Sequence, residues 1–240
     1  MKKKPCALLI AGLLWVVFQS AIHLVLARTP QAGVRAQGGG ADSLRILVWV
    51  YNYPHVPDRT LAEAEREVTR IFAKAGIRTE WIQCPVSAAE AQAHPACQDR
   101  MSARELALTI LPQFNASTRG NSDSYFGSAQ VFSNGQFGHY AYVYYDRVED
   151  TENRGGASSY QILAAVALHE IGHLLLCSNA HSRTGLMRAQ WDRRDLENAA
   201  QGQLCFTPSQ AHIIYAEVRA RVAQEENLGL SPPGLAETSF

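Results

Sequence analysis

Residues 158–177 read SSYQILAAVALHEIGHLLLC, and this stretch decides how the rest of the chain is interpreted. Ser158 and Gln161, three residues apart, form the pattern of a capping box, which marks the first turn of a helix. Between residues 162 and 176 the only charged or imidazole side chains belong to the motif HEIGH. We therefore expect a buried helix whose few polar side chains must have partners, because burying such groups alone is costly.

The HEIGH motif places two imidazoles on one face of this helix. His169 and His173 are four residues apart, and a rotation of 100° per residue leaves the second ring only about 40° from the first. Both rings can therefore reach one metal ion, and imidazole nitrogens suit Zn²⁺. Glu170 lies next to them, where its carboxylate can accept a proton from a zinc-bound water. The motif therefore indicates a zinc centre with its own general base.

These residues resemble a known family. HExxH on a helix with apolar neighbours, here ALHEIGHLLL, is similar to the signature of the zincin metallopeptidases. Within that superfamily the metzincins continue as HExxHxxGxxH and then place a methionine beneath the metal. This chain departs from the longer pattern, because Leu176 stands at the glycine position and Asn179 at the position of the third histidine.

His181 follows two residues after the expected position, and we predict that it is the third zinc ligand, since spacing in a loop is more elastic than spacing on a helix. The sequence TGLM at residues 184–187 then resembles the metzincin Met-turn, with Met187 as the apolar floor of the site. Other zincins take the third ligand from an acidic residue further along the chain, and Asp192, Asp195 and Glu197 are the rival candidates here. The segment before Asp192 lacks a helical start, which favours His181.

The remaining segments alternate between strand and helix patterns. A helical pattern over residues 61–75 separates the first two strand patterns and predicts a parallel strand–helix–strand unit. A second capping box, Thr207 and Gln210, begins a final helix. The strand patterns lie at residues 43–53, 77–84, 107–112, 124–132 and 139–148, with an Asn-Gly turn between the last two. We expect an α+β fold, zincin-like by the resemblance, in which a twisted mixed sheet packs on the catalytic helix and a helical part ends the chain.

The N-terminus has the three parts of an export signal. Lys2, Lys3 and Lys4 precede an apolar run, and small residues near Ala27 match the cleavage rule. We predict a signal peptide at 1–27, a flexible linker at 28–43, the catalytic domain at 44–226 and a flexible tail at 227–240. The product would be secreted or periplasmic. An uncleaved N-terminal membrane anchor is the alternative.

Export allows the cysteines to pair. Without the signal peptide four remain, and they allow three pairings that the sequence alone does not distinguish. Cys84 with Cys97 closes the shortest loop, so we favour that disulfide, from which Cys177–Cys205 follows. A metal thiolate at Cys177 is the alternative.

The balance of 22 basic and 22 acidic residues leaves no excess of positive charge for nucleic acid. The motif and the resemblance together predict an exported, monomeric zinc metallopeptidase that acts on peptides or proteins. A peptide would add to a sheet edge formed by residues 135–146, and Tyr142 or Tyr144 could help to stabilise the oxyanion. The alternative is an exported binding domain on a degenerate zincin scaffold, without catalysis and with structural zinc or none.

Overall fold

The computed structural model describes residues 44–92, 94–98, 100–113, 126–132 and 134–229. The predicted signal peptide and linker, and the predicted tail from residue 230 onward, lie outside these residues.

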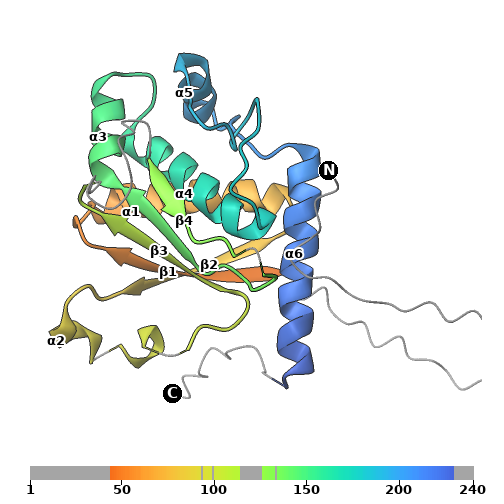
Figure 1. The fold of residues 1–240 in the computed structure, drawn as a ribbon. Helices are drawn as coiled ribbons and strands as arrows, with labels where there is room; N and C mark the ends of the chain where they lie inside the picture. Colours follow the sequence, from red (N-terminus) through yellow and green to blue (C-terminus); the bar gives the residue numbers. More distant parts are fainter. Residues whose placement is uncertain (1–43, 93, 99, 114–125, 133, 230–240) are drawn as a thin grey trace, which may run out of the picture.

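A five-stranded mixed sheet forms the centre of the fold (Figure 1). Its spatial order is β2-β1-β3-β5-β4. The edge strand β4 runs antiparallel to β5, and the other pairs are parallel. The strands are β1 (Arg45–Asn52), β2 (Arg78–Cys84), β3 (Glu105–Leu111), β4 (Gly127–Ala129) and β5 (Tyr140–Tyr144). This mixed sheet confirms the predicted α+β class.

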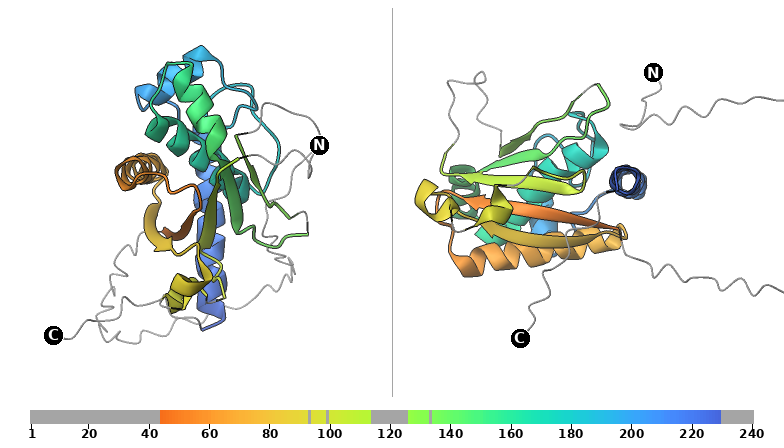
Figure 2. Two further views of the ribbon diagram at one scale, coloured as in Figure 1. Left: turned by 90° about the vertical axis from the view of Figure 1, so that its left-hand side faces the viewer. Right: turned by 90° about the horizontal axis from the view of Figure 1, so that it is seen from below.

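Helices α1 (Asp58–Lys74) and α4 (Ser159–Leu176) cover one face of the sheet, and the short helix α2 (Ala88–Ala91) lies on the other side (Figure 1). The predicted strand–helix–strand unit is present as β1, α1 and β2, with Arg45 opposite Arg78 in parallel register. Helix α6 (Pro208–Asn227) stands at one end of the sheet and is seen end-on in the right view of Figure 2.

Helix α4 lies at the centre of the hydrophobic core. Its capping box of Ser158 and Gln161 is formed as predicted, and 14 of its residues are buried. It is long and apolar enough to cross a membrane, but a buried core helix of a water-soluble fold has the same composition. Its polar motif is therefore held inside the protein, which is what the sequence pattern predicted.

One local prediction about the strands is wrong. The strand expected to continue to residue 148 ends at Tyr144, and α3 (Tyr145–Asn153) begins there. Tyr145, Val148 and Thr151 are the buried residues of α3, and their spacing of three is helical rather than alternating. Helix α5 (Arg193–Ala200) follows the site, with Asp192 as the N-cap whose carboxylate accepts the N–H groups of Arg194 and Asp195.

The predicted Cys84–Cys97 disulfide is present and ties the end of β2 to the segment after α2. The predicted Cys177–Cys205 disulfide is wrong, because Cys205 is a free thiol. Its sulfur lies 3.5 Å from the ammonium group of Lys74 at the end of α1, while Cys177 ends helix α4.

A buried arginine joins α6 to the rest of the core. Arg221 is fully buried and pairs with Glu217 one turn earlier, 3.0 Å away. Its remaining donors reach three backbone carbonyls, those of Ala103, Gly138 and Leu174. One guanidinium therefore connects α6, the C-terminal turn of α4 and the loops before β3 and β5.

We predict that Arg221→Met destabilises the protein by about 3–5 kcal/mol, because it leaves Glu217 buried without its cation and removes the donors to three carbonyls. The measurement is urea unfolding at unchanged m-value. Arg219→Met on the exposed side of the same helix should change the free energy of unfolding by no more than about 0.5 kcal/mol. Equal midpoints for the two variants would contradict the structural role of Arg221.

Candidate metal centre

The last two turns of α4 and the loop after it bring three imidazoles together. His169 and His173 lie on the helix, and Cys177, in a left-handed conformation with φ of 47°, ends it. The chain then turns back so that His181 faces the helical pair. One ligand atom from each ring lies within 4.8 Å of the others, and within the described residues this is the cluster able to hold a metal ion.

Backbone carbonyls orient the two helical rings. The Nδ1 atom of His169 lies 2.8 Å from the carbonyl oxygen of Leu186, and that of His173 lies 2.7 Å from the carbonyl oxygen of Ser178. Because a carbonyl oxygen can only accept, each Nδ1 must carry the hydrogen, an assignment inferred from the hydrogen-bond partners. Each neutral ring therefore presents an unprotonated Nε2 to the centre of the cluster.

This orientation makes the centre a cation site. The two Nε2 atoms are 3.1 Å apart, and in these tautomers neither carries a hydrogen to donate to the other. Burial lowers the pKa of His169 to about 4 and also lowers the pKa of His173, so the rings are neutral at pH 7. Two nitrogens bound to one zinc ion at ~2.1 Å each would be ~3.4 Å apart in tetrahedral geometry. The residues present therefore fit a zinc ion.

A tight turn packs against α4 between the two helical histidines. The amide of Ser182 donates to the carbonyl of Met187, and Gly185 adopts a φ of 76°. Met187 is fully buried, and its sulfur lies so close to Gly172 of the HEIGH motif that a Cβ there would come within 2.7 Å of it. Gly172 is therefore the small residue that lets the methionine pack under the helix between the two histidines.

Glu170 is buried beside the cluster and faces the edge strand. Within the described residues its carboxylate has no hydrogen-bond or ion-pair partner, and burial raises its pKa to about 8. A Cβ on Gly127 of β4 would lie 2.7 Å from Cγ of Glu170. The absence of a side chain at Gly127 therefore makes the space that Glu170 occupies. A cation at the histidine cluster would favour the ionised carboxylate.

The three rival acids lie away from the histidine cluster and have other partners. Asp192 and Asp195 both accept from Arg188, and they cap the start of α5. Glu197 pairs with Arg193 on the exposed side of the same helix. The structure thus brings His181, rather than any of these acids, to the helical pair.

Two expectations about the sheet need correction. The segment expected to form the open edge contains β5, which is paired on both sides, and the edge strand is β4. Ala141 and Val143 of β5 are buried toward α4, so the alternation of a strand turns Tyr142 and Tyr144 to the opposite face. Tyr144 there contacts the hydroxyl of Ser128, 3.2 Å away. The two tyrosines therefore lie on the face remote from the cluster.

Sequence reasoning missed two residues that shape the site. Gly127 has no recognisable signal, because its role depends on a helix more than 40 residues later. Trp191 lies edge-on to the ring of His169, with centroids 5.7 Å apart. Its indole N–H donates to the carbonyl of Leu186, the same oxygen that orients His169. The sequence signal for Trp191 was its position four residues after Met187, the last residue of the Met-turn-like segment.

No family model matches the chain, and no curated protein matches its sequence. Solved structures with a similar arrangement include an archaemetzincin from Methanopyrus kandleri, at a TM-score of 0.47 and 10% sequence identity, covering 74% of this chain and 98% of that one. A zinc-dependent peptidase from Methanocorpusculum labreanum is also similar, at a TM-score of 0.45 and 12% identity, covering 70% of this chain and 99% of that one.

Proposed function

We propose that this protein is an exported zinc-dependent metallopeptidase. The observation that carries the proposal is the set of three imidazoles, two of them turned by backbone carbonyls to point their lone pairs at one centre, with Glu170 buried alongside. His169, His173 and His181 would hold the metal. Export rests on the N-terminal sequence pattern alone.

Zinc is the metal that this donor set suits best. Three neutral nitrogen ligands leave a fourth position for water or substrate, which is the arrangement of catalytic rather than structural zinc sites. Calcium and magnesium prefer oxygen ligands, and none of the three histidines offers one.

Glu170 is the proposed general base and acid. His169, His173 and His181 would hold a zinc ion that would lower the pKa of water toward ~7 and polarise a substrate carbonyl. The carboxylate of Glu170 would take the proton from the attacking water and return it to the nitrogen of the leaving amine. Its packing against Gly127 holds it in one place and keeps bulk water away from it.

The edge strand β4 is the place for the substrate backbone. Within the described residues β4 pairs with β5 on one side only, and it packs against α4 at Glu170. An extended peptide can add to such an edge through its main-chain N–H and C=O groups, which recognises a peptide largely independently of sequence. This position replaces the β5 segment expected from the sequence.

We predict about one zinc ion per chain, lost when any of the three histidines is removed. His181→Ala should weaken zinc binding by at least about a hundredfold, because a three-ligand site becomes a two-ligand site. Zinc content after dialysis against a competing chelator is the measurement, with exposed His212→Ala as the matched control. Full zinc retention by His181→Ala would exclude it as a ligand.

Glu170→Gln should lower kcat/KM by roughly 10²–10⁴-fold while zinc content stays unchanged, because the amide keeps the shape of the side chain but cannot accept the proton. Cleavage of casein and of a peptide library is measured with and without a chelator. Glu197→Gln, at the exposed rival position on α5, should retain activity. Stoichiometric zinc without cleavage by the unaltered protein would instead favour the binding-domain alternative.

Gly127→Ala should reduce activity by about tenfold or more at unchanged zinc content. The new methyl group would lie 2.4 Å from the carbonyl oxygen of Tyr142 and 2.7 Å from Cγ of Glu170, so either β4 or the carboxylate must move. Thermal unfolding, recorded in parallel, separates local displacement from loss of the fold. Full activity in this variant would show that the position of Glu170 does not depend on Gly127.

A further inference from the structure

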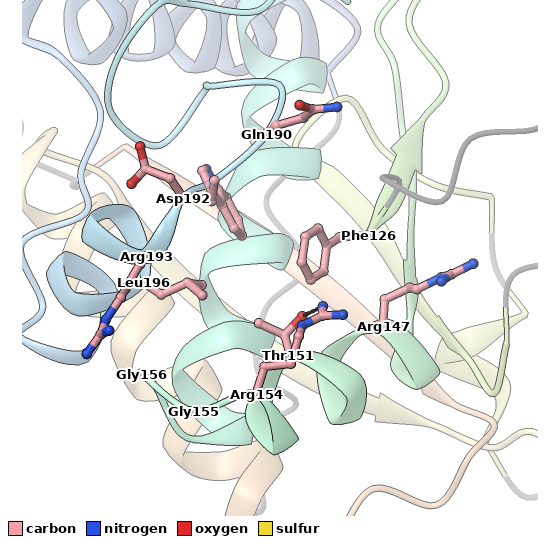
Figure 3. A pocket seen from close by; sticks show the side chains of 11 residues that line it. Phe126, Arg147, Thr151, Arg154, Gly155, Gly156, Gln190, Asp192, Arg193 and Leu196 are labelled. Atoms are coloured by element: carbon pink, nitrogen blue, oxygen red, sulfur yellow. Dashed lines mark hydrogen bonds between the residues drawn. The ribbon is translucent and has the colours of Figure 1, made fainter.

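A cavity of about 640 Å³ lies next to the candidate metal centre, between α3, α5 and the residue before β4 (Figure 3). Its apolar wall is formed by Phe126, Trp191 and Leu196. Arginines from two helices supply most of its charge. The cavity thus combines an aromatic wall with guanidinium groups.

The cavity is separated from the metal centre by one side chain. Trp191 packs edge-on against His169 on one side and lines the cavity on the other, where its ring is 5.6 Å from that of Phe126. Phe126 is joined directly to Gly127, which contacts Glu170. A peptide lying along β4 would therefore reach the cavity with a residue close to the bond that is cut.

The charges lining the cavity are unbalanced. Arg147 and Arg154 come from α3 and its end, and Arg193 comes from α5, whereas Asp192 is the acidic lining residue. The carboxylate of Asp192 already accepts from Arg188 at 2.6 Å and caps α5, so it does not neutralise the arginines. Arg193 pairs with Glu197 and is 90% exposed, which places its charge in solvent.

Arg154 is the best-placed cation. Its Nη2 donates to the hydroxyl of Thr151, which is 2.9 Å away and buried, and Figure 3 shows the guanidinium lying beside Thr151 and Phe126. Within the described part of the chain, no carboxylate pairs with Arg154. Arg147 adds a buried Nε atom that makes no hydrogen bond there, although the carboxylate of Asp146 lies 3.9 Å from it in a long ion pair. The guanidinium of Arg154 thus has donors to spare for an anion, and Arg147 adds a second cation that only a long ion pair engages.

We infer that this cavity binds a carboxylate of the peptide substrate, with Arg154 as the main contact, Arg147 as the second, and Phe126 and Trp191 packing on the attached aliphatic chain. A guanidinium binds a carboxylate through two charge-assisted hydrogen bonds, and a side-chain amide, which has only one oxygen, cannot accept both of them. The inference rests on the proposed peptidase activity and names its specificity: a glutamate or aspartate side chain near the scissile bond, or the C-terminal carboxylate of a peptide.

The experiment compares pairs of peptides with an acetylated N-terminus and an amidated C-terminus. The two peptides of a pair differ only by glutamate or glutamine at one position, and that position is moved along the peptide from pair to pair. The zinc-loaded protein should cleave the best glutamate peptide roughly ten- to a hundredfold more efficiently than its glutamine partner. Arg154→Met should lower kcat/KM for the glutamate peptide by a similar factor and leave the glutamine peptide within about threefold. Arg219→Met, on the exposed side of α6, is the control and should keep the full preference.

A third peptide, with glutamine and a free C-terminal carboxylate, distinguishes the two sources. A preference for it that Arg154→Met abolishes would assign the cavity to the chain end, and a preference for the internal glutamate would assign it to a side chain. A glutamate-to-glutamine ratio near one in the unaltered protein, or a ratio unchanged in the Arg147→Met, Arg154→Met double variant, would overturn the inference.

Calorimetric binding to zinc-loaded Glu170→Gln protein gives a readout that does not depend on cleavage. Glutamate peptides should bind roughly ten- to a hundredfold more tightly than glutamine peptides, and only when Arg154 is present. Arginine-dependent binding without any cleavage by the unaltered protein would refute the peptidase proposal and support the carboxylate site. Cleavage that does not discriminate between glutamate and glutamine peptides would support the peptidase proposal and refute the carboxylate site.

Discussion

Two backbone carbonyls decide what the histidine cluster can do. If Leu186 and Ser178 did not accept from the Nδ1 atoms, either helical ring could carry its hydrogen on Nε2, and the pair could bond to each other instead of to a metal. Both acceptors lie on the chain that follows α4, outside the helix that carries the rings. The HEIGH motif therefore supplies the ligands, while the loop after it sets their protonation and makes the centre attractive to a cation.

The buried HEIGH motif is closely packed on both sides of α4. Glycine on each side of the helix allows the contacts: Gly172 admits the sulfur of Met187 from below, and Gly127 admits Glu170 against the edge strand. A buried carboxyl without a partner is costly, and the raised pKa of Glu170 is the sign of that cost. A metal at the histidines would offset it by favouring the charged form, so the site is most stable when it is loaded.

The sequence could predict the features that depend on local spacing. The capping box of Ser158, the helical histidine pair and the first strand–helix–strand unit all follow from residues within one or two turns of each other. Features that depend on contacts between distant segments could not be predicted. Examples are the contact of Gly127 with Glu170, the free thiol of Cys205, and the hydrogen bond from the indole of Trp191 to the carbonyl of Leu186. The strand expected to run past Tyr144 failed for a different reason, because aromatic residues favour strands while the buried spacing after that point is helical.

The segment after α4 departs from the metzincin spacing, yet it carries the third histidine, the methionine floor and one wall of the cavity. The cavity wall and the helical pair are linked through a single atom, because the carbonyl oxygen of Leu186 accepts both from His169 and from the indole of Trp191. Under the proposed function, a substrate side chain in the cavity would contact Trp191, and a shift of that indole would change the hydrogen bonding of the carbonyl that also orients His169, the proposed metal ligand. This shared acceptor would couple the position of the cavity wall to the orientation of the His169 ring. If the protein is a peptidase as proposed, this coupling would let the fit of a substrate residue affect the geometry of the ligands at the metal.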